Sequence, residues 1–159
     1  MGNYKKTLTE RNFQERFVRE LEKYRWVAPN ELDGNKQKVM VDDLINHWRA
    51  ELNRINADQL EDVALTDSEF AQVMSKVNQI DNSFEAAKIL AMEGSTGKID
   101  GIYRDDNPKV IRKQITLTIF KKAEVSGGDS SYKIAREITT SNGNRFDIVL
   151  LINGLPLIN

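Results

Sequence analysis

The sequence contains no cysteine and only one histidine, His47, among its 159 residues. Disulfide bonds and thiolate metal sites are therefore excluded, and a single histidine gives little basis for a zinc site or a Ser-His-Asp arrangement. No stretch approaches the roughly 18 apolar residues that a membrane span needs. The first residues also lack an apolar core of signal-peptide length. We therefore expect a cytoplasmic chain that makes no contact with membranes.

An excess of basic charge is missing as well, since 23 Lys and Arg residues stand against 24 Asp and Glu residues. A domain that holds DNA through its overall electrostatic field is usually basic. Any contact with DNA would therefore need a local patch or parts of a larger protein. The composition, 40% hydrophobic and 30% charged residues, is that of an ordinary globular protein.

The spacing of apolar residues divides the chain into two parts, although we expect residues 1–159 to form a single domain. Residues 1–94 show the periodicity of helices, and residues 99–159 show the alternation of strands. The expected fold class is α+β, with N-terminal helices packed on a mixed β-sheet.

Four helices are expected in the first part. Capping boxes at Thr7–Glu10 and Thr66–Glu69 mark the start of two of them, and apolar spacing predicts another over residues 39–55. The fourth is expected over residues 83–93, with Gly94 as its C-terminal cap. The apolar face of the first helix, which we expect to pack on the sheet, consists of Phe13, Phe17, Leu21 and Tyr24, with Val18 at its flank.

The second part contains strand segments and a clear turn signal. Residues 115–120 and 132–139 alternate between apolar and polar side chains, and the apolar run 146–152 predicts a strand buried on both faces. Asn153-Gly154 is the strongest short hairpin signal known. The strand that follows is still apolar where the sequence ends, so we expect the chain to be a fragment of a longer protein.

Asp147 is unusual because it opens the strongly apolar segment 147–152. A carboxylate there is either buried at a high cost in free energy or placed at a strand end that faces a cleft. The pattern alone favours a simpler role, in which Asp147 caps the preceding turn or pairs with Arg145.

The last sixteen residues, NRFDIVLLINGLPLIN over Asn144–Asn159, resemble a segment of the restriction (R) subunit of type I restriction-modification enzymes. In that family an aspartate opens a strand, an Asn-Gly-Leu-Pro hairpin follows, and the next strand carries Glu-x-Lys. This is the core of the PD-(D/E)xK nuclease superfamily. A weaker likeness covers Thr9–Trp26, Asp100-Gly101 and the strand from Ile115.

The resemblance implies a truncated restriction-endonuclease-like core and Mg²⁺-dependent cleavage of double-stranded DNA, coupled in the parent to ATP-driven translocation. It makes Asp147 the catalytic, metal-binding aspartate, because Mg²⁺ binds carboxylates and activates water. Glu-x-Lys would fall beyond Asn159, so we expect the chain by itself to be inactive. ATP would bind to downstream motor domains. The implied partners are DNA and the methyltransferase and specificity subunits.

Several other residues invite a functional interpretation. Members of the superfamily often add a helical glutamate: Glu15 best matches the family's opening helix and Glu20 better fits helical geometry, while solvated charge remains the alternative for both. Asp43 and His47 have the spacing of a helical metal pair. Because both lie off the apolar stripe of their helix, we favour a solvated ion pair. Gly94–Lys98 lacks the four residues between glycines of a phosphate-binding loop, so we expect a helix cap and turn.

A basic cluster flanks the strand that begins at Ile115. Edge-strand protection is the commoner use of such residues, and a surface for the DNA backbone is the alternative. Arg145, two residues from Asp147, is more strongly expected to lie near the candidate metal site than this cluster is. The cluster comprises Lys109, Arg112, Lys113, Lys121 and Lys122.

Two rival functions remain open. The helical part could be an interaction module that docks the R subunit onto the methyltransferase core, which binding to a cognate methyltransferase complex would indicate. The chain could instead be a free-standing binding protein with an accidental hairpin resemblance. The coding sequence after Asn159 would distinguish this possibility from membership of the family, since the family motif requires Glu-x-Lys there.

Overall fold

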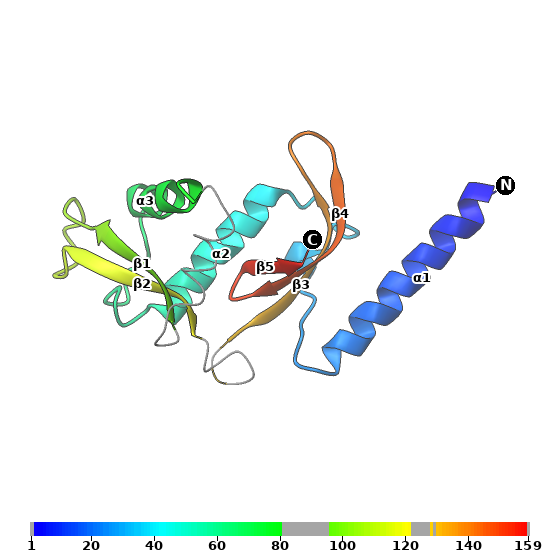
Figure 1. Cartoon of the computed structure of the whole chain (residues 1–159), viewed down its shortest axis with the longest axis horizontal. Coiled ribbons are helices and arrows are strands. Elements are labelled where there is room, and N and C mark those ends of the chain that lie inside the picture. Colours follow the sequence, from blue (N-terminus) through cyan, green and yellow to red (C-terminus); the bar gives the residue numbers. More distant parts are fainter. Residues whose placement is uncertain (1, 81–95, 122–127, 129, 159) are drawn as a thin grey trace. The chain divides into compact units, whose positions relative to one another are not determined.

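The computed structural model describes residues 2–80, 96–121, 128 and 130–158. In these residues the chain is an α+β protein with three α-helices (Figure 1). The helices are α1 (Gly2–Glu22), α2 (Val41–Ile55) and α3 (Asp67–Asn78), and the strands are β1 (Thr96–Tyr103), β2 (Gln114–Lys121), β3 (Tyr132–Thr139), β4 (Arg145–Ile152) and β5 (Leu155–Ile158).

Contacts divide the chain into two compact units. Unit 1 comprises residues 1–46 and 131–159, and unit 2 comprises residues 47–130. The expectation that residues 1–159 form one domain stays a prediction, and each unit is described by itself.

The sheet of unit 1 is antiparallel, with strand order β3-β4-β5. Its tight β4–β5 turn is Asn153-Gly154, where both residues have positive φ, 50° and 80°. A two-residue hairpin loop with this backbone matches the twist of the strands it joins, and Asn-Gly adopts it readily. The hairpin predicted from the sequence is therefore confirmed.

The outer edge of β3 is covered by residues 27–40. Isolated parallel bridges join Val27 to Lys133, Asp33 to Arg136 and Met40 to Thr139. Parallel pairing is limited to these bridges, and the named strands form two antiparallel sheets in the described residues. The arrangement therefore differs from the one mixed sheet expected from the sequence.

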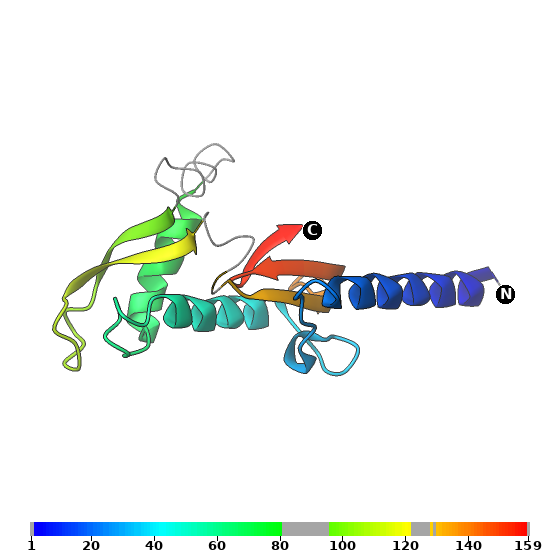
Figure 2. The ribbon, with the colours of Figure 1, turned by 90° about the horizontal axis from the view of Figure 1, so that it is seen from below.

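Apolar side chains fill both faces of this sheet. On one face Leu32 and Val39 pack with residues of β3 and β4. On the other, Val18 of α1 packs against Ile134 and Leu150, and Figure 2 shows the C-terminal end of α1 beside the sheet. The N-terminal helix thus packs on the sheet as expected, through a single face.

The buried face of α1 agrees with the prediction only in part: Leu21 packs against the core cluster as expected, and Val18, predicted at the flank, belongs to it. Gln14 and Val18 are buried, whereas the side chains of Phe13 and Phe17 are 61% and 38% exposed and that of Tyr24 is 72% exposed. The helix also begins at Gly2, so Thr7 lies inside it and not at its start. Periodicity found the helix, but it could not show which apolar side chains would meet the sheet.

In unit 2, α3 begins at the predicted capping box. The Thr66 hydroxyl accepts a hydrogen bond from the Glu69 N–H, and the Glu69 carboxylate accepts one from the Thr66 N–H. The helix lies against the antiparallel pair β1–β2 (Figure 2). Of the sequence expectations, the helix over 83–93 lies outside the described residues, while Thr96–Lys98 belong to β1 instead of a turn.

A fully buried arginine joins the loops of unit 2 to α3. The Arg104 guanidinium donates to the Glu69 carboxylate and to the carbonyl oxygens of Leu60 and Val63, at 2.9–3.0 Å. Asn107 donates to the same carboxylate oxygen. A buried charge is tolerated only when it is paired and hydrogen-bonded, and Arg104 meets both conditions.

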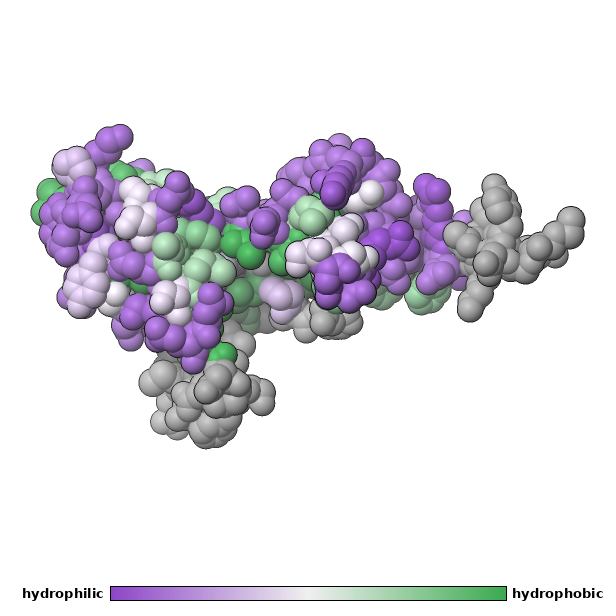
Figure 3. All heavy atoms as spheres, turned by 90° about the horizontal axis from the view of Figure 1, so that it is seen from above, coloured by the Kyte–Doolittle hydropathy of each residue, from purple (hydrophilic) through white to green (hydrophobic). Residues whose placement is uncertain are grey.

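Hydrophilic side chains cover much of the face drawn in Figure 3. Within the described residues, no helix has both the length and the apolar character to cross a membrane.

We predict that Glu69→Gln lowers the free energy of unfolding by about 3 kcal/mol, because it leaves the buried Arg104 charge without its counter-charge. Urea unfolding near neutral pH measures the change. The matched control is Glu22→Gln, an exposed helical glutamate, which should change the stability by less than about 0.5 kcal/mol.

The difference between wild type and Glu69→Gln should also depend on pH. Burial raises the pKa of Glu69, but hydrogen bonds from Arg104, Thr66 and Asn107 and the Arg104 charge outweigh it and hold the pKa below 4.5. The ionised carboxylate therefore stabilises the fold above pH 4.5, and this stabilisation is lost as the pH falls through the folded-state pKa. A stability gap that stays constant down into that acid range would contradict the assignment.

Candidate functional site around Asp147

Asp147 lies on the exposed stretch of β4. Residues 145–148 alternate between exposed and half-buried, with Arg145 and Asp147 exposed, whereas residues 149–152 are all buried. Asp147 forms no hydrogen bond or ion pair within the part of the chain that the structure describes. Its carboxylate is therefore available to an external ligand, while the strand behind it is fixed in the core.

The strand opposite Asp147 has an unusual backbone. Arg136 pairs with Ile148 and Ile138 pairs with Phe146, so Glu137 occupies the register position that faces Asp147. Glu137 has φ of 53°, in the left-handed region that non-glycine residues seldom adopt. This breaks the alternation of β3, and Ala135 and Ile138 consequently pack into the same cluster.

Gly34 holds this irregular backbone from the side. Its N–H donates to the Arg136 carbonyl oxygen at 2.8 Å. A Cβ atom at residue 34 would lie 2.1 Å from the Glu137 carbonyl oxygen and 2.8 Å from the Glu137 Cβ. Only glycine allows the chain to approach so closely.

The Glu137 side chain reaches back to the strand that carries Asp147. The Glu137 side chain is only 12% exposed and forms an ion pair with Arg145 Nε at 2.7 Å, whereas the Arg145 side chain is 62% exposed. The sequence left open that Asp147 itself pairs with Arg145. In the structure the partner of Arg145 is Glu137 instead.

The helical glutamates are not brought to Asp147. Glu15 pairs with Arg11, and Glu20 with Lys23, in exposed ion pairs along α1. The face of β4 that α1 contacts carries Ile148 and Leu150, and neighbouring residues of a strand point to opposite faces. Solvated helix charge, the alternative for both residues, is therefore what the structure shows.

The basic cluster of unit 2 serves the loop that precedes β2. The Arg112 guanidinium donates to the Asp58 carbonyl oxygen and the Lys113 ammonium to the Asn107 carbonyl oxygen, each at 2.9 Å. Lys121 and Lys122 lie outside the described side chains.

The described residues contain no group of three or more His, Asp or Glu side chains that could hold a metal ion. The Asp43 carboxylate accepts a hydrogen bond from the Met40 N–H at 2.7 Å, at the start of α2. The carboxylate of Asp147 is therefore the candidate ligand that remains from the sequence analysis.

Sequence reasoning missed Glu137 and Gly34. Glu137 occupies an ordinary polar position in an alternating strand, and a positive φ at a glutamate leaves no mark in the sequence. Gly34 did lie in a polar loop, where a glycine normally indicates only a turn.

Comparison with known proteins gives distant relatives. The chain is 28% identical over 117 residues to the type I restriction enzyme SauMSSORF170P endonuclease subunit of Staphylococcus aureus strain MSSA476, a match over 72% of this chain and 11% of the relative. The corresponding SsaAORF53P subunit of Staphylococcus saprophyticus is 27% identical over the same length. The chain thus spans about a tenth of these relatives. No family model and no solved structure matches it.

We predict that Gly34→Ala destabilises unit 1 by about 3 kcal/mol or more, because the new methyl group would overlap the backbone of Glu137 and force it to move. Urea unfolding and the amide spectrum of residues 136–138 measure this. Gly143→Asn is the control: no atom lies near its added Cβ, and asparagine tolerates positive φ, so the change should cost less than about 1 kcal/mol. Equal effects would show that the close contact does not constrain β3.

Proposed function

We propose that the chain belongs to the nuclease region of a type I restriction endonuclease subunit, with Asp147 as a metal-binding catalytic residue of a PD-(D/E)xK core. The observation that carries the proposal is the exposed, unpaired carboxylate at the start of an otherwise buried strand. A tight hairpin joins this strand to its antiparallel neighbour β5. The relatives named as endonuclease subunits support the same reading.

The carboxylate of Asp147 suits Mg²⁺, which binds to one or two carboxylates and retains several waters. A bound Mg²⁺ would stabilise charge on a phosphate and lower the pKa of a water. Asp147 would hold the ion at the sheet surface, and the buried half of β4 would fix the position of its backbone. No Glu-x-Lys follows Asp147 within the 159 residues.

The whole protein would cut double-stranded DNA in the cytoplasm, together with methyltransferase and specificity subunits. Translocation driven by ATP would belong to motor domains outside these residues. This wider role rests on relatives of which the chain covers only 11%.

We predict that Mn²⁺, used as a paramagnetic substitute for Mg²⁺, weakly but selectively broadens the amide signals of residues 145–149. Asp147→Asn should abolish this broadening because it removes the only unpaired carboxylate of the exposed stretch. The control Asp106→Asn, an exposed aspartate of unit 2, should leave it unchanged. Broadening near Asp147 that survives Asp147→Asn would overturn the assignment of the ligand.

We predict that the 159-residue chain does not cleave plasmid DNA in Mg²⁺. Asp147 alone would hold the metal ion, without the second acidic ligand and the lysine of the superfamily motif. Gel analysis of supercoiled plasmid measures cleavage. Nicking that Asp147→Ala abolishes would show that the missing residues are dispensable.

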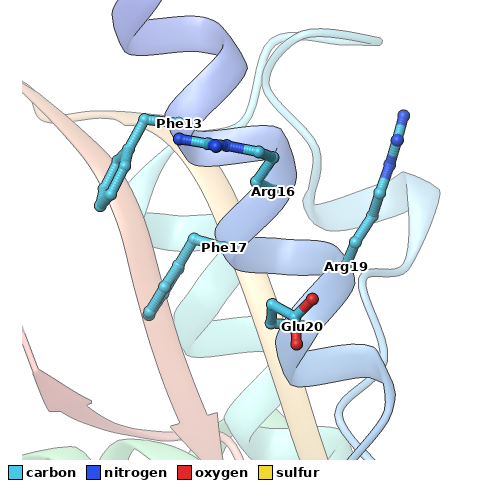
Figure 4. A pocket seen from close by; sticks show the side chains of 5 residues that line it. All are labelled: Phe13, Arg16, Phe17, Arg19 and Glu20. Atoms are coloured by element: carbon cyan, nitrogen blue, oxygen red, sulfur yellow. The ribbon is translucent and has the colours of Figure 1, made fainter.

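Docking onto the methyltransferase core is the second candidate function, and the exposed rings of α1 favour it. Phe13 and Phe17 stack at a centroid distance of 6.4 Å. They project from the same side of α1 and line an open depression with Arg16, Arg19 and Glu20 (Figure 4). Large exposed aromatic side chains are enriched at protein interfaces. Binding of the chain to a cognate methyltransferase complex is the observation that would favour this function.

A further inference from the structure

We propose that Arg145 binds a DNA phosphate next to the metal site and that Glu137 is the residue that positions it. This inference rests on the proposed nuclease function and adds two residues to the proposed site. Arg145 would contact the substrate directly. Glu137 would act only through Arg145.

The geometry of the guanidinium supports a phosphate contact. Arginine has five N–H donors in a rigid planar fork that matches the oxygens of a phosphate. The Glu137 carboxylate pairs with Nε at 2.7 Å. No other partner of Arg145 occurs among the residues that the structure describes, so its terminal Nη groups remain available. The side chain is 62% exposed, and the fork is therefore accessible from solvent.

The position on β4 places this fork beside Asp147. The two residues are both exposed and lie two positions apart on the same strand, with half-buried Phe146 between them. Their separation along β4 is about 6.6 Å, from two residues at about 3.3 Å each. A phosphate near an ion on Asp147 would lie within reach of the long Arg145 side chain.

The backbone around Glu137 indicates that its carboxylate is held in place. Glu137 adopts positive φ, which costs a non-glycine residue of order 1 kcal/mol, and Gly34 packs directly against it. Its side chain is mostly buried although its partner is exposed. An exposed ion pair that formed only by chance would need neither the strained backbone nor the close contact.

The test uses the 159-residue chain and a short DNA duplex at low salt with Mg²⁺ present. Binding is measured by fluorescence anisotropy and by the Arg145 Nε–Hε signal. Arg145→Gln should weaken binding about tenfold, as expected for a lost hydrogen bond to a charged group, and reduce the slope of log K against log salt by about 0.9. The control Arg19→Gln removes an exposed arginine of α1 (Figure 4) and should change the affinity less than about twofold.

The direction in which Glu137→Gln changes the affinity for DNA separates a positioning role from a simple charge effect. Removing a negative charge should strengthen DNA binding if only net charge matters. If Glu137 positions Arg145, binding should weaken instead, and the Nε–Hε signal should shift towards that of a free arginine. An unchanged amide spectrum elsewhere in unit 1 shows that the variant is folded.

Two outcomes overturn the inference: tighter binding in Glu137→Gln, or no duplex-induced shift at the Arg145 Nε–Hε signal of wild type. The Mn²⁺ broadening at Asp147 is measured without DNA and therefore tests the proposed metal ligand separately. If that broadening is present and the Arg145 results fail, the inference alone is wrong. If the broadening is absent, the proposed function fails together with the inference that rests on it.

Discussion

The contact of Gly34 with the backbone of Glu137 is the constraint on which the exposed end of unit 1 depends. Antiparallel strands normally alternate their side chains between two faces. The positive φ of Glu137 breaks that alternation in β3, and the segment 27–40, hydrogen-bonded along the outer edge of β3, supports the irregular backbone. The break turns Ile138 into the core. It also leaves the Glu137 carboxylate bound to Arg145, beside the register position of Asp147.

Arg104 and Arg145, each paired with a glutamate, show how the burial of an arginine decides whether it can still bind a ligand. Arg104 is fully buried, and its guanidinium nitrogens donate to Glu69 and to two backbone carbonyls. Such a group stabilises the loops of unit 2 and has little capacity left for a ligand. Arg145 is anchored through Nε alone and is mostly exposed. The same residue type is therefore a structural tie in one unit and a candidate for recognition in the other.

Local signals in the sequence predicted what depends on local physics. The capping box at Thr66 and the Asn153-Gly154 turn are set by hydrogen bonds and dihedral angles within a few residues, and both are confirmed. The buried face of α1 depends on the distant side chains Ile134 and Leu150, which explains why Phe13 and Phe17 were wrongly placed in the core. Glu137 joins the candidate site only through strand register and through Gly34, a contact that spans about a hundred residues of sequence. No local pattern encodes such a contact.

The charge of the exposed strip bears on how a chain with net charge −1 could hold DNA. Glu137 and Asp147 contribute two carboxylates and Arg145 one guanidinium, so the strip by itself is negative and repels a phosphate. A divalent cation on Asp147 would reverse that sign. Metal binding and phosphate binding at the strip would then be thermodynamically coupled, each strengthening the other by the same factor. A large basic surface is therefore unnecessary at this site, because the metal ion would supply the positive charge that the exposed strip lacks.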